Sequence, residues 1–209
     1  MAELITGLDA AKVRANLERI RAELPDTVEI LAAVKYVPLE EMGTLEDAGI
    51  TLVGENRAQD LEAKATAHPG LRWHFIGQLQ SRKVKQILPY VELIHSVASD
   101  SALRQLERHG TPETEILVEV NIAREEGKAG IDPDELAAFI ERCPVTVAGL
   151  MTMPPFAADP EASRPYFAAL RELAGAHDLR HLSMGTSQDY RVAAEEGATI
   201  VRLGTILYA

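Results

Sequence analysis

This sequence of 209 residues has only one cysteine, no long apolar run and no excess of basic residues. The single cysteine, Cys143, excludes an internal disulfide and any cysteine-based metal cluster, and it is typical of a protein from a reducing compartment. No apolar run approaches the ~18 residues of a membrane span, and the N-terminus lacks the basic-then-apolar order of a signal peptide. We therefore expect a cytoplasmic protein without a metal site.

Charge and composition exclude further classes of protein. A formal net charge of -11 argues against a nucleic-acid or anionic-membrane partner, although a local basic pocket for a small anion stays possible. Hydrophobic residues make up 46% of the chain and charged residues 25%, which is ordinary globular composition. Because no linker, repeat or low-complexity tract interrupts the chain, we expect one domain over residues 1–209.

Apolar runs and helical periodicities alternate along the chain. An opening helix is predicted between Asp9, a plausible N-cap, and Pro25. Strands are predicted over residues 30–34, 51–54, 72–77, 91–96, 115–121, 145–151, 180–184 and 199–204, and helices over about 38–49, 58–67, 81–88, 100–108, 132–142, 160–176 and 187–196. Eight such units are the number that closes a barrel, so we predict an α/β fold, a (β/α)8 TIM barrel with an extra N-terminal helix. An open doubly wound sheet is the alternative.

Lys35 is the most unusual residue of the first predicted strand. Five apolar residues precede it and Pro38 follows, so the lysine lies where a buried strand ends. Ligands of parallel α/β proteins bind at that end of the strands. A desolvated lysine can lose its proton and form a Schiff base with a carbonyl compound, whereas a lysine that snorkels to solvent would give the same local pattern.

Polar residues and glycines gather at the carboxyl ends of the other predicted strands. The segment from Ser183 to Ser187 predicts a glycine turn that opens onto a helix, whose first amides can hold an anion. Gly204 and Thr205 follow the last strand, and barrels commonly bind phosphate between these two turns. A phosphate site opposite a lysine suggests a phosphorylated aldehyde, but a helix N-cap with a tight turn would look alike.

Together these segments resemble the pyridoxal phosphate homeostasis proteins, relatives of the alanine racemase N-terminal barrel. The resemblance covers nearly the whole chain, and its motifs occur in the order of that family. They are Ala33-Val-Lys-Tyr-Val-Pro38, Gly54-Glu-Asn-Arg57, His74-Phe-Ile-Gly-Gln-Leu-Gln80, Ile94-His-Ser-Val97, Gly149-Leu-Met151, Ser183-Met-Gly-Thr-Ser-Gln-Asp189 and Arg202-Leu-Gly-Thr205. The resemblance implies that pyridoxal 5'-phosphate is bound as a Schiff base on Lys35.

The same resemblance implies roles for individual residues. It places the phosphate against Ser183, the turn at Gly185 and Thr186, and the amides of Gly204 and Thr205. Arg202 is implied beside the pyridine nitrogen, where a permanent cation disfavours ring protonation and weakens the cofactor as an electron sink. The implied cofactor-binding residues are Lys35, Asn56, Met151, Ser183, Met184, Gly185, Thr186, Arg202, Gly204 and Thr205.

Four further residues are left with open or altered roles. His74 is expected to be a core histidine bonded to a carbonyl, and Lys128 is either a second amine near the site or a solvated loop lysine. Val37 stands where many relatives carry a second lysine, which puts a lysine-to-lysine transfer route in doubt. Arg82 stands where asparagine is usual.

The expected function follows from this resemblance. Racemases and decarboxylases on this barrel add a second domain that supplies an acid/base partner, and no clear candidate for such a partner is found before Ala209. We expect a non-catalytic carrier that holds pyridoxal phosphate, serves vitamin B6 homeostasis, delivers to apo enzymes and is a monomer or weak dimer. The alternatives are a weak amino-acid racemase or other pyridoxal-phosphate-dependent lyase, and an aldolase-type barrel that acts on a sugar phosphate.

Overall fold

The computed structural model describes residues 4–209 and closes eight parallel strands into one barrel. Neighbouring strands pair in chain order, and the first strand closes the ring against the last. The strands are β1 (Glu29–Ala33), β2 (Leu52–Glu55), β3 (Arg72–Phe75), β4 (Leu93–Val97), β5 (Glu115–Glu119), β6 (Thr146–Met151), β7 (His181–Thr186) and β8 (Ile200–Leu203). The predicted barrel is confirmed, and the open sheet is excluded.

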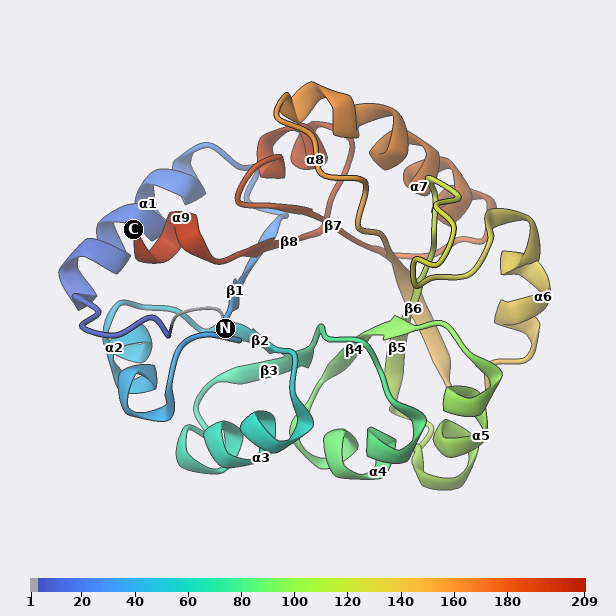
Figure 1. The fold of residues 1–209 in the computed structure, drawn as a ribbon, viewed down its shortest axis with the longest axis horizontal. Coiled ribbons are helices and arrows are strands. Elements are labelled where there is room, and N and C mark those ends of the chain that lie inside the picture. The colour runs from blue at the N-terminus through green and yellow to red at the C-terminus, as the bar shows by residue number, and fades with distance from the viewer. Residues whose placement is uncertain (1–3) are drawn as a thin grey trace.

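Helices surround the ring of strands (Figure 1). They are α1 (Ala10–Ala22), α2 (Met42–Asp47), α3 (Ala58–Ala67), α4 (Val84–Ile87), α5 (Asp100–His109), α6 (Leu136–Glu141), α7 (Arg164–Ala176), α8 (Tyr190–Glu195) and α9 (Thr205–Tyr208). Short 3-10 turns precede or follow several of them: η1 (Leu39–Glu41), η2 (Ser81–Lys83), η3 (Leu88–Tyr90), η4 (Pro133–Glu135) and η5 (Pro160–Ser163). The final helix, α9, was not predicted.

The opening helix α1 forms for the reasons that its sequence indicates. The side chain of Asp9 accepts hydrogen bonds from the amides of Ala11 and Lys12, which would otherwise lack partners at the start of the helix. Residues at helical spacing, Val13, Leu17 and Ile20, are buried against the barrel. The predicted N-terminal helix and its cap are therefore confirmed.

Two separate apolar clusters follow from the alternation of side chains along each strand. Outward-facing residues pack against the helices in a large cluster. Inward-facing residues form a small cluster inside the barrel, made of Leu31, Leu52, Leu93, Leu117, Ala148, Met151 and Ile200. Other inward positions carry polar side chains, all of them buried: His74, His95, Ser183 and Arg202.

None of the helices within residues 4–209 is both long enough and apolar enough to cross a membrane.

Candidate functional site

Lys35 and the last two strand-to-helix turns lie at the same end of the barrel. Ala32 pairs with Leu203, so the chain leaves β1 towards Lys35 next to the point where it leaves β8 towards Gly204. A side-chain carbon at Gly204 would come within 4.0 Å of Ala33 Cβ. The structure therefore brings the predicted amine and the predicted anion site to one rim.

Lys35 continues the inward face of β1, on which Leu31 lies. Its side chain is half-buried, and its Nζ lies 4.8 Å from the centroid of the Tyr36 ring. The preceding peptide is fixed on both sides, because Val34 N donates to Gly54 O at 2.9 Å and Val34 O accepts from Lys64 Nζ at 2.8 Å. The backbone next to Lys35 is thus held by hydrogen bonds to β2 and α3.

A buried ion pair supports this part of the rim from the outside of the barrel. Lys64 of α3 is 5% exposed and Glu55 of β2 is 0% exposed, with Nζ and Oε2 separated by 2.5 Å. The second carboxylate oxygen of Glu55 accepts from the amides of Asn56 and Arg57 at 2.6 and 3.1 Å. Lys64 Nζ donates both to Val34 O after β1 and to Glu55 at the end of β2, so the lysine connects the two strand ends.

The turn after β7 needs the glycine that the sequence places there. Gly185 has φ +89, and a side-chain carbon at this position would lie 2.5 Å from Ala193 Cβ and 3.1 Å from Tyr190 Cα. Only glycine combines this backbone conformation with such close packing against α8. The predicted glycine turn is therefore present, although α8 begins at Tyr190 rather than at residue 187.

Some polar groups of the two turns are already engaged. The carboxylate of Asp189 accepts from Thr186 N at 2.8 Å and from Thr186 Oγ1 at 3.1 Å. Gly204 N donates to Ser187 Oγ at 3.2 Å. The groups of Thr186 and Gly204 implied for phosphate thus shape the turns in this structure.

Other amides of the same turns remain available. Among residues 4–209, the backbone N–H groups of Ser187, Gln188, Thr205 and Ile206 make no hydrogen bond. Ser187, Gln188 and Ile206 also line a cavity of about 420 Å³. Unpaired amides in two adjacent turns are what an oxyanion needs, so the backbone fits a phosphate group.

Arg202 lies inside the barrel and is only 7% exposed. Its Nη1 donates to Ser183 O at 2.7 Å and to Ser183 Oγ at 2.5 Å, and its Nη2 donates to Thr152 O at 3.0 Å. Burial lowers the pKa of Arg202 to about 10, against the opposing charges of Glu119 and Asp189, so the side chain stays cationic at neutral pH. The structure thus provides a fixed cation facing the interior of the barrel.

Ser183 and Met184 lie deeper than the resemblance implies. Ser183 is 0% exposed, and its hydroxyl is shared between Arg202 and His95. Met184 is 0% exposed and packs in the outer cluster, so its side chain is directed away from the barrel interior. The Met151 side chain is 3% exposed in the inner cluster.

His74 is a core histidine, as expected, but its partner is different. Its Nδ1 lies 2.9 Å from His95 Nε2 rather than against a carbonyl group. Burial lowers the pKa of His74 to about 3, with the charge of Arg72 adding to the effect. Burial also lowers the pKa of His95 well below its usual value, and both imidazoles are neutral at pH 7. The expectation of a carbonyl partner was therefore wrong.

Two further ionisable groups lie near the barrel mouth. Burial raises the pKa of the Glu119 carboxyl on β5, and the charges of Arg202 and Lys128 partly oppose this rise. Lys128 forms an ion pair with Glu125 in the loop after β5 and is an exposed residue. This pairing favours the solvated-loop interpretation of Lys128, while its charge still reaches Glu119.

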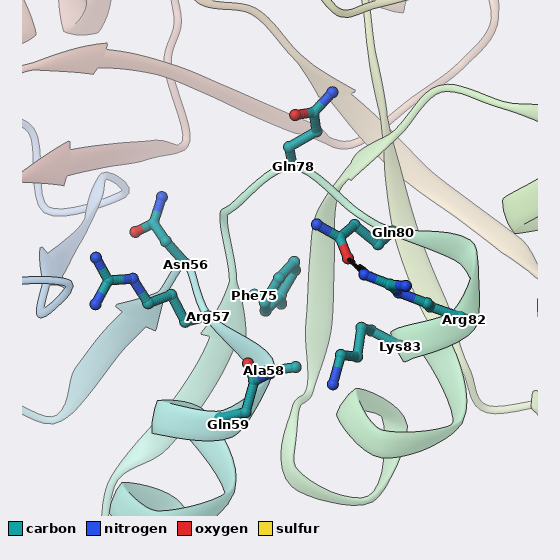
Figure 2. Close-up of a pocket in the computed structure, with 9 residues that line it drawn as sticks. All are labelled: Asn56, Arg57, Ala58, Gln59, Phe75, Gln78, Gln80, Arg82 and Lys83. Atoms are coloured by element: carbon teal, nitrogen blue, oxygen red, sulfur yellow. Dashed lines mark hydrogen bonds between the residues drawn. The ribbon is translucent and has the colours of Figure 1, made fainter.

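Asn56 follows β2 at the rim and lines a small pocket of about 240 Å³ (Figure 2). Arg82 and Lys83 lie on the opposite wall, and the ring of Phe75 lies between the two walls. Arg82 turns towards Gln80 Oε1, at 3.2 Å from its Nη2, and in Figure 2 the Arg57 side chain extends away from the pocket. The cations around this pocket therefore do not converge on one point.

His95 and Lys64 are the site residues that the sequence interpretation missed. The alternation of β4 places His95 inward together with Leu93, but alternation alone does not say which face is inward. Lys64 shares the helical face of Leu61 and Ala65, and a lysine on an apolar face was a signal for a buried partner.

Comparison of this chain with known proteins identifies its family. Residues 8–209 match the model of the family described as "Alanine racemase, N-terminal domain". The pyridoxal phosphate homeostasis protein of Aquifex aeolicus is 42% identical over 195 residues, which cover 86% of each chain. The protein of the same name from Vibrio cholerae is 34% identical over 224 residues, which cover 94% of this chain and 95% of that one.

Solved structures agree with this result. The structure of PipY from Synechococcus elongatus PCC7942 with PLP bound has a TM-score of 0.82 and 31% identity, and the match covers 94% of this chain and all of that chain (100%). A Chlorella virus arginine decarboxylase has a TM-score of 0.75 at 15% identity, and the match covers 97% of this chain but 64% of the decarboxylase. At that identity the second likeness shows the barrel fold alone.

Proposed function

The chain belongs to the pyridoxal phosphate homeostasis protein family, and on that premise we propose that it binds pyridoxal 5'-phosphate through Lys35 for intracellular supply rather than for substrate turnover. One observation supports this most directly. The unpaired amides of the turns after β7 and β8 share a barrel end with the Lys35 amine. An anion site and an amine on one rim suit a phosphorylated aldehyde.

The residues that would hold the cofactor follow from their free donors. The amides of Ser187, Gln188, Thr205 and Ile206 would hold the phosphate, which moves part of this role from Ser183 and Thr186 to their neighbours. When bound, the cofactor would supply an aldehyde, and Lys35 would present its amine to that group for a Schiff base.

Arg202 would meet the ring of the cofactor. Its two terminal nitrogens are taken by Ser183, Thr152 and the Met153 sulfur, whereas its Nε–H makes no hydrogen bond among residues 4–209. Within that range no buried polar side-chain atom lacks a partner, so Nε is not sealed inside the barrel. A donor that stays cationic favours an unprotonated ring nitrogen, which makes the cofactor a weak electron sink and suits storage better than carbanion chemistry.

The test is the absorption spectrum of the purified protein after incubation with pyridoxal phosphate. A new visible band, lost on borohydride treatment, with the label found on Lys35 by peptide mass spectrometry, supports the proposal. Lys35→Ala should lack the band, and Lys128→Ala, a change to an exposed loop lysine, should keep it. Absence of the band from the wild-type protein would refute cofactor binding and leave the aldolase-type alternative.

Supply is tested by transfer. The loaded protein is mixed with an apo enzyme that depends on pyridoxal phosphate, and the recovery of enzyme activity is followed with time. Recovery faster than free release of the cofactor supports delivery to apo enzymes. Recovery at the rate of free release would limit the role to storage.

A weak racemase is the second candidate, because the Glu119 carboxyl at the mouth has a raised pKa and could take up a proton. Formation of D-alanine from L-alanine at enzyme-like rates, abolished in both Lys35→Ala and Glu119→Gln, would favour turnover. We expect no such formation above the rate of free pyridoxal phosphate.

A further inference from the structure

A line of buried hydrogen bonds extends from Arg202 into the barrel, away from the rim. Arg202 Nη1 contacts Ser183 Oγ at 2.5 Å, Ser183 Oγ lies 2.8 Å from His95 Nδ1, and His95 Nε2 lies 2.9 Å from His74 Nδ1. We call Ser183, His95 and His74 the histidine column. Its members are 0%, 0% and 2% exposed, so water does not substitute for any of these bonds.

Only one arrangement of protons satisfies the whole column. A guanidinium can only donate, so Ser183 Oγ accepts from Arg202 and its own proton goes to His95 Nδ1. His95 then carries its proton on Nε2 and donates it to His74 Nδ1. His74 in turn carries its proton on Nε2, which lies 3.9 Å from Glu92 Oε2. The hydrogen bonds therefore all point the same way, from the cation towards the amino-terminal ends of the strands.

The direction of these hydrogen bonds determines how Ser183 contacts the Arg202 guanidinium. If His95 were protonated on Nδ1, it would donate to Ser183 Oγ, and the Ser183 hydroxyl proton would then have no acceptor in the column. With the acceptor nitrogen facing Ser183, the hydroxyl keeps its lone pairs for Nη1. The guanidinium is then fixed along one edge, and its Nε–H is left for a ligand.

We propose that His95, supported by His74, is a positioning residue that sets the Ser183 hydroxyl as an acceptor and so orients Arg202 towards the bound ligand. The inference rests on the proposed function for the identity of that ligand. The histidine column is present in the protein without a ligand. The direction of its hydrogen bonds can therefore be tested even if pyridoxal phosphate does not bind.

The first experiment uses ¹⁵N-histidine-labelled wild-type protein without cofactor. Long-range ¹H–¹⁵N spectra distinguish Nε2–H from Nδ1–H imidazoles. We expect His95 and His74 to be single Nε2–H tautomers at pH 7. A His95 signal of the Nδ1–H form, or an average of both tautomers, would overturn the proposal.

The second experiment separates positioning from packing. His95→Leu removes the acceptor, whereas His95→Asn keeps an amide oxygen near the position of Nδ1 and loses only the bond to His74. Because a hydrogen bond to a charged group is at stake, pyridoxal phosphate affinity should fall about tenfold or more in His95→Leu. We expect His95→Asn to stay within about threefold of the wild type, by the same conversion of free energy into affinity.

Stability measurements complete the design. Both variants should unfold at lower urea concentration than the wild type, since both disturb the buried column, and His109→Asn on the surface of α5 serves as the control. If affinity falls by the same factor in His95→Leu and His95→Asn, or follows their stability, the column only fills the core and the proposal fails. If the wild type does not bind pyridoxal phosphate, the proposed function fails, and the tautomer result still decides the column.

Discussion

Buried histidines make the stability of this barrel depend on pH. His74 and His95 are neutral in the fold because burial disfavours their charged forms. In the unfolded chain each takes up a proton near pH 6.5. Between that pH and the folded pKa of His74, about 3, the unfolded state binds more protons, so stability falls as pH falls.

We therefore expect the free energy of unfolding to drop between pH 7 and 5, with each histidine contributing up to about 1.4 kcal/mol per pH unit below 6.5. Urea unfolding at several pH values measures this slope. His74→Gln should flatten it by about one proton, whereas His109→Gln on the exposed face of α5 should leave it unchanged. A slope that is equal in the wild type and His74→Gln would show that His74 is already protonated in the fold.

The ion pair of Glu55 and Lys64 gives a second prediction at this scale. Lys64→Met leaves a buried carboxylate without its cation, and the free energy of unfolding should fall by about 3–5 kcal/mol. Adding Glu55→Gln should recover much of this loss, because an amide oxygen still accepts from the amides of Asn56 and Arg57. Urea melts of the single and double variants measure both effects.

Lys85→Met on an exposed position of α4 is the matched control and should be nearly neutral. If Lys64→Met is as mild as Lys85→Met, the carboxyl of Glu55 does not need its partner. The double variant then has nothing to recover, and the support for Val34 must come from the strand pairing alone.

The positions of individual site residues could be predicted only as accurately as the ends of the strands that carry them. Lys35, Asn56 and Arg202 were placed at the carboxyl ends of strands by sequence, and the structure has them at that end or just inside it. The resemblance implied that Ser183 faces a phosphate, and the seventh strand was predicted to end at residue 184. The strand extends to Thr186, so Ser183 lies inside the barrel and contacts Arg202 instead.

At the scale of elements, the close approach of β6 and β7 depends on Gly149. A side-chain carbon there would lie 2.0 Å from His181 O and 2.6 Å from His181 C, both backbone atoms of the paired strand. Neither atom can move without separating the strands. Gly149→Ala should therefore cost about 3 kcal/mol or more, measured by thermal or urea unfolding.

Gly43→Ala in α2 is the control, because an added carbon meets nothing within 4 Å. This change should be neutral or stabilising by up to about 1 kcal/mol, since alanine loses less backbone entropy in a helix. Equal effects of the two substitutions would mean that the sheet relaxes around Gly149 without cost.

Elements with clear periodicity were predictable, and those shaped by tertiary contacts were not. The predicted helix over residues 58–67 coincides with α3. The predicted helix over residues 81–88 consists instead of η2 and α4, followed by η3, which contains Pro89; a proline has no N–H with which to continue an α-helix. The start of α8 was displaced because Asp189 folds back onto Thr186 and holds the turn open.

At the scale of the whole molecule, the number of predicted strands was enough to predict a closed barrel. The contacts that hold the first and last elements together could not be seen in the sequence. The four residues of α9 are too few to show a period, yet they join the two ends of the chain. Asn16 Nδ2 of α1 donates to Leu207 O at 3.1 Å and to Ala209 O at 3.0 Å. Tyr208 OH donates to Ala33 O at 3.2 Å, and α9 lies beside α1 in Figure 1.

Removal of residues 205–209 should therefore weaken the barrel between β1 and β8. The deletion uncovers the pairing of β1 with β8 and removes the fully buried Leu207, a loss of about 2–5 kcal/mol for that side chain alone. Hydrogen exchange should accelerate more at β1 and β8 than at β4 and β5, because local opening needs less free energy than global unfolding. Uniform acceleration in all strands would mean that α9 stabilises the whole barrel and does not specifically hold β1 against β8.

The same deletion removes the amides of Thr205 and Ile206, half of the proposed phosphate cradle. The rise in melting temperature that pyridoxal phosphate gives the intact protein by binding the folded state should then be lost. Asn16→Ala separates the two consequences, because it removes the hydrogen bonds between α1 and α9 but leaves both amides in the chain. We expect it to lower the melting temperature while keeping most of the increase due to the cofactor, and a loss of that increase in Asn16→Ala would show that the cradle depends on closure itself.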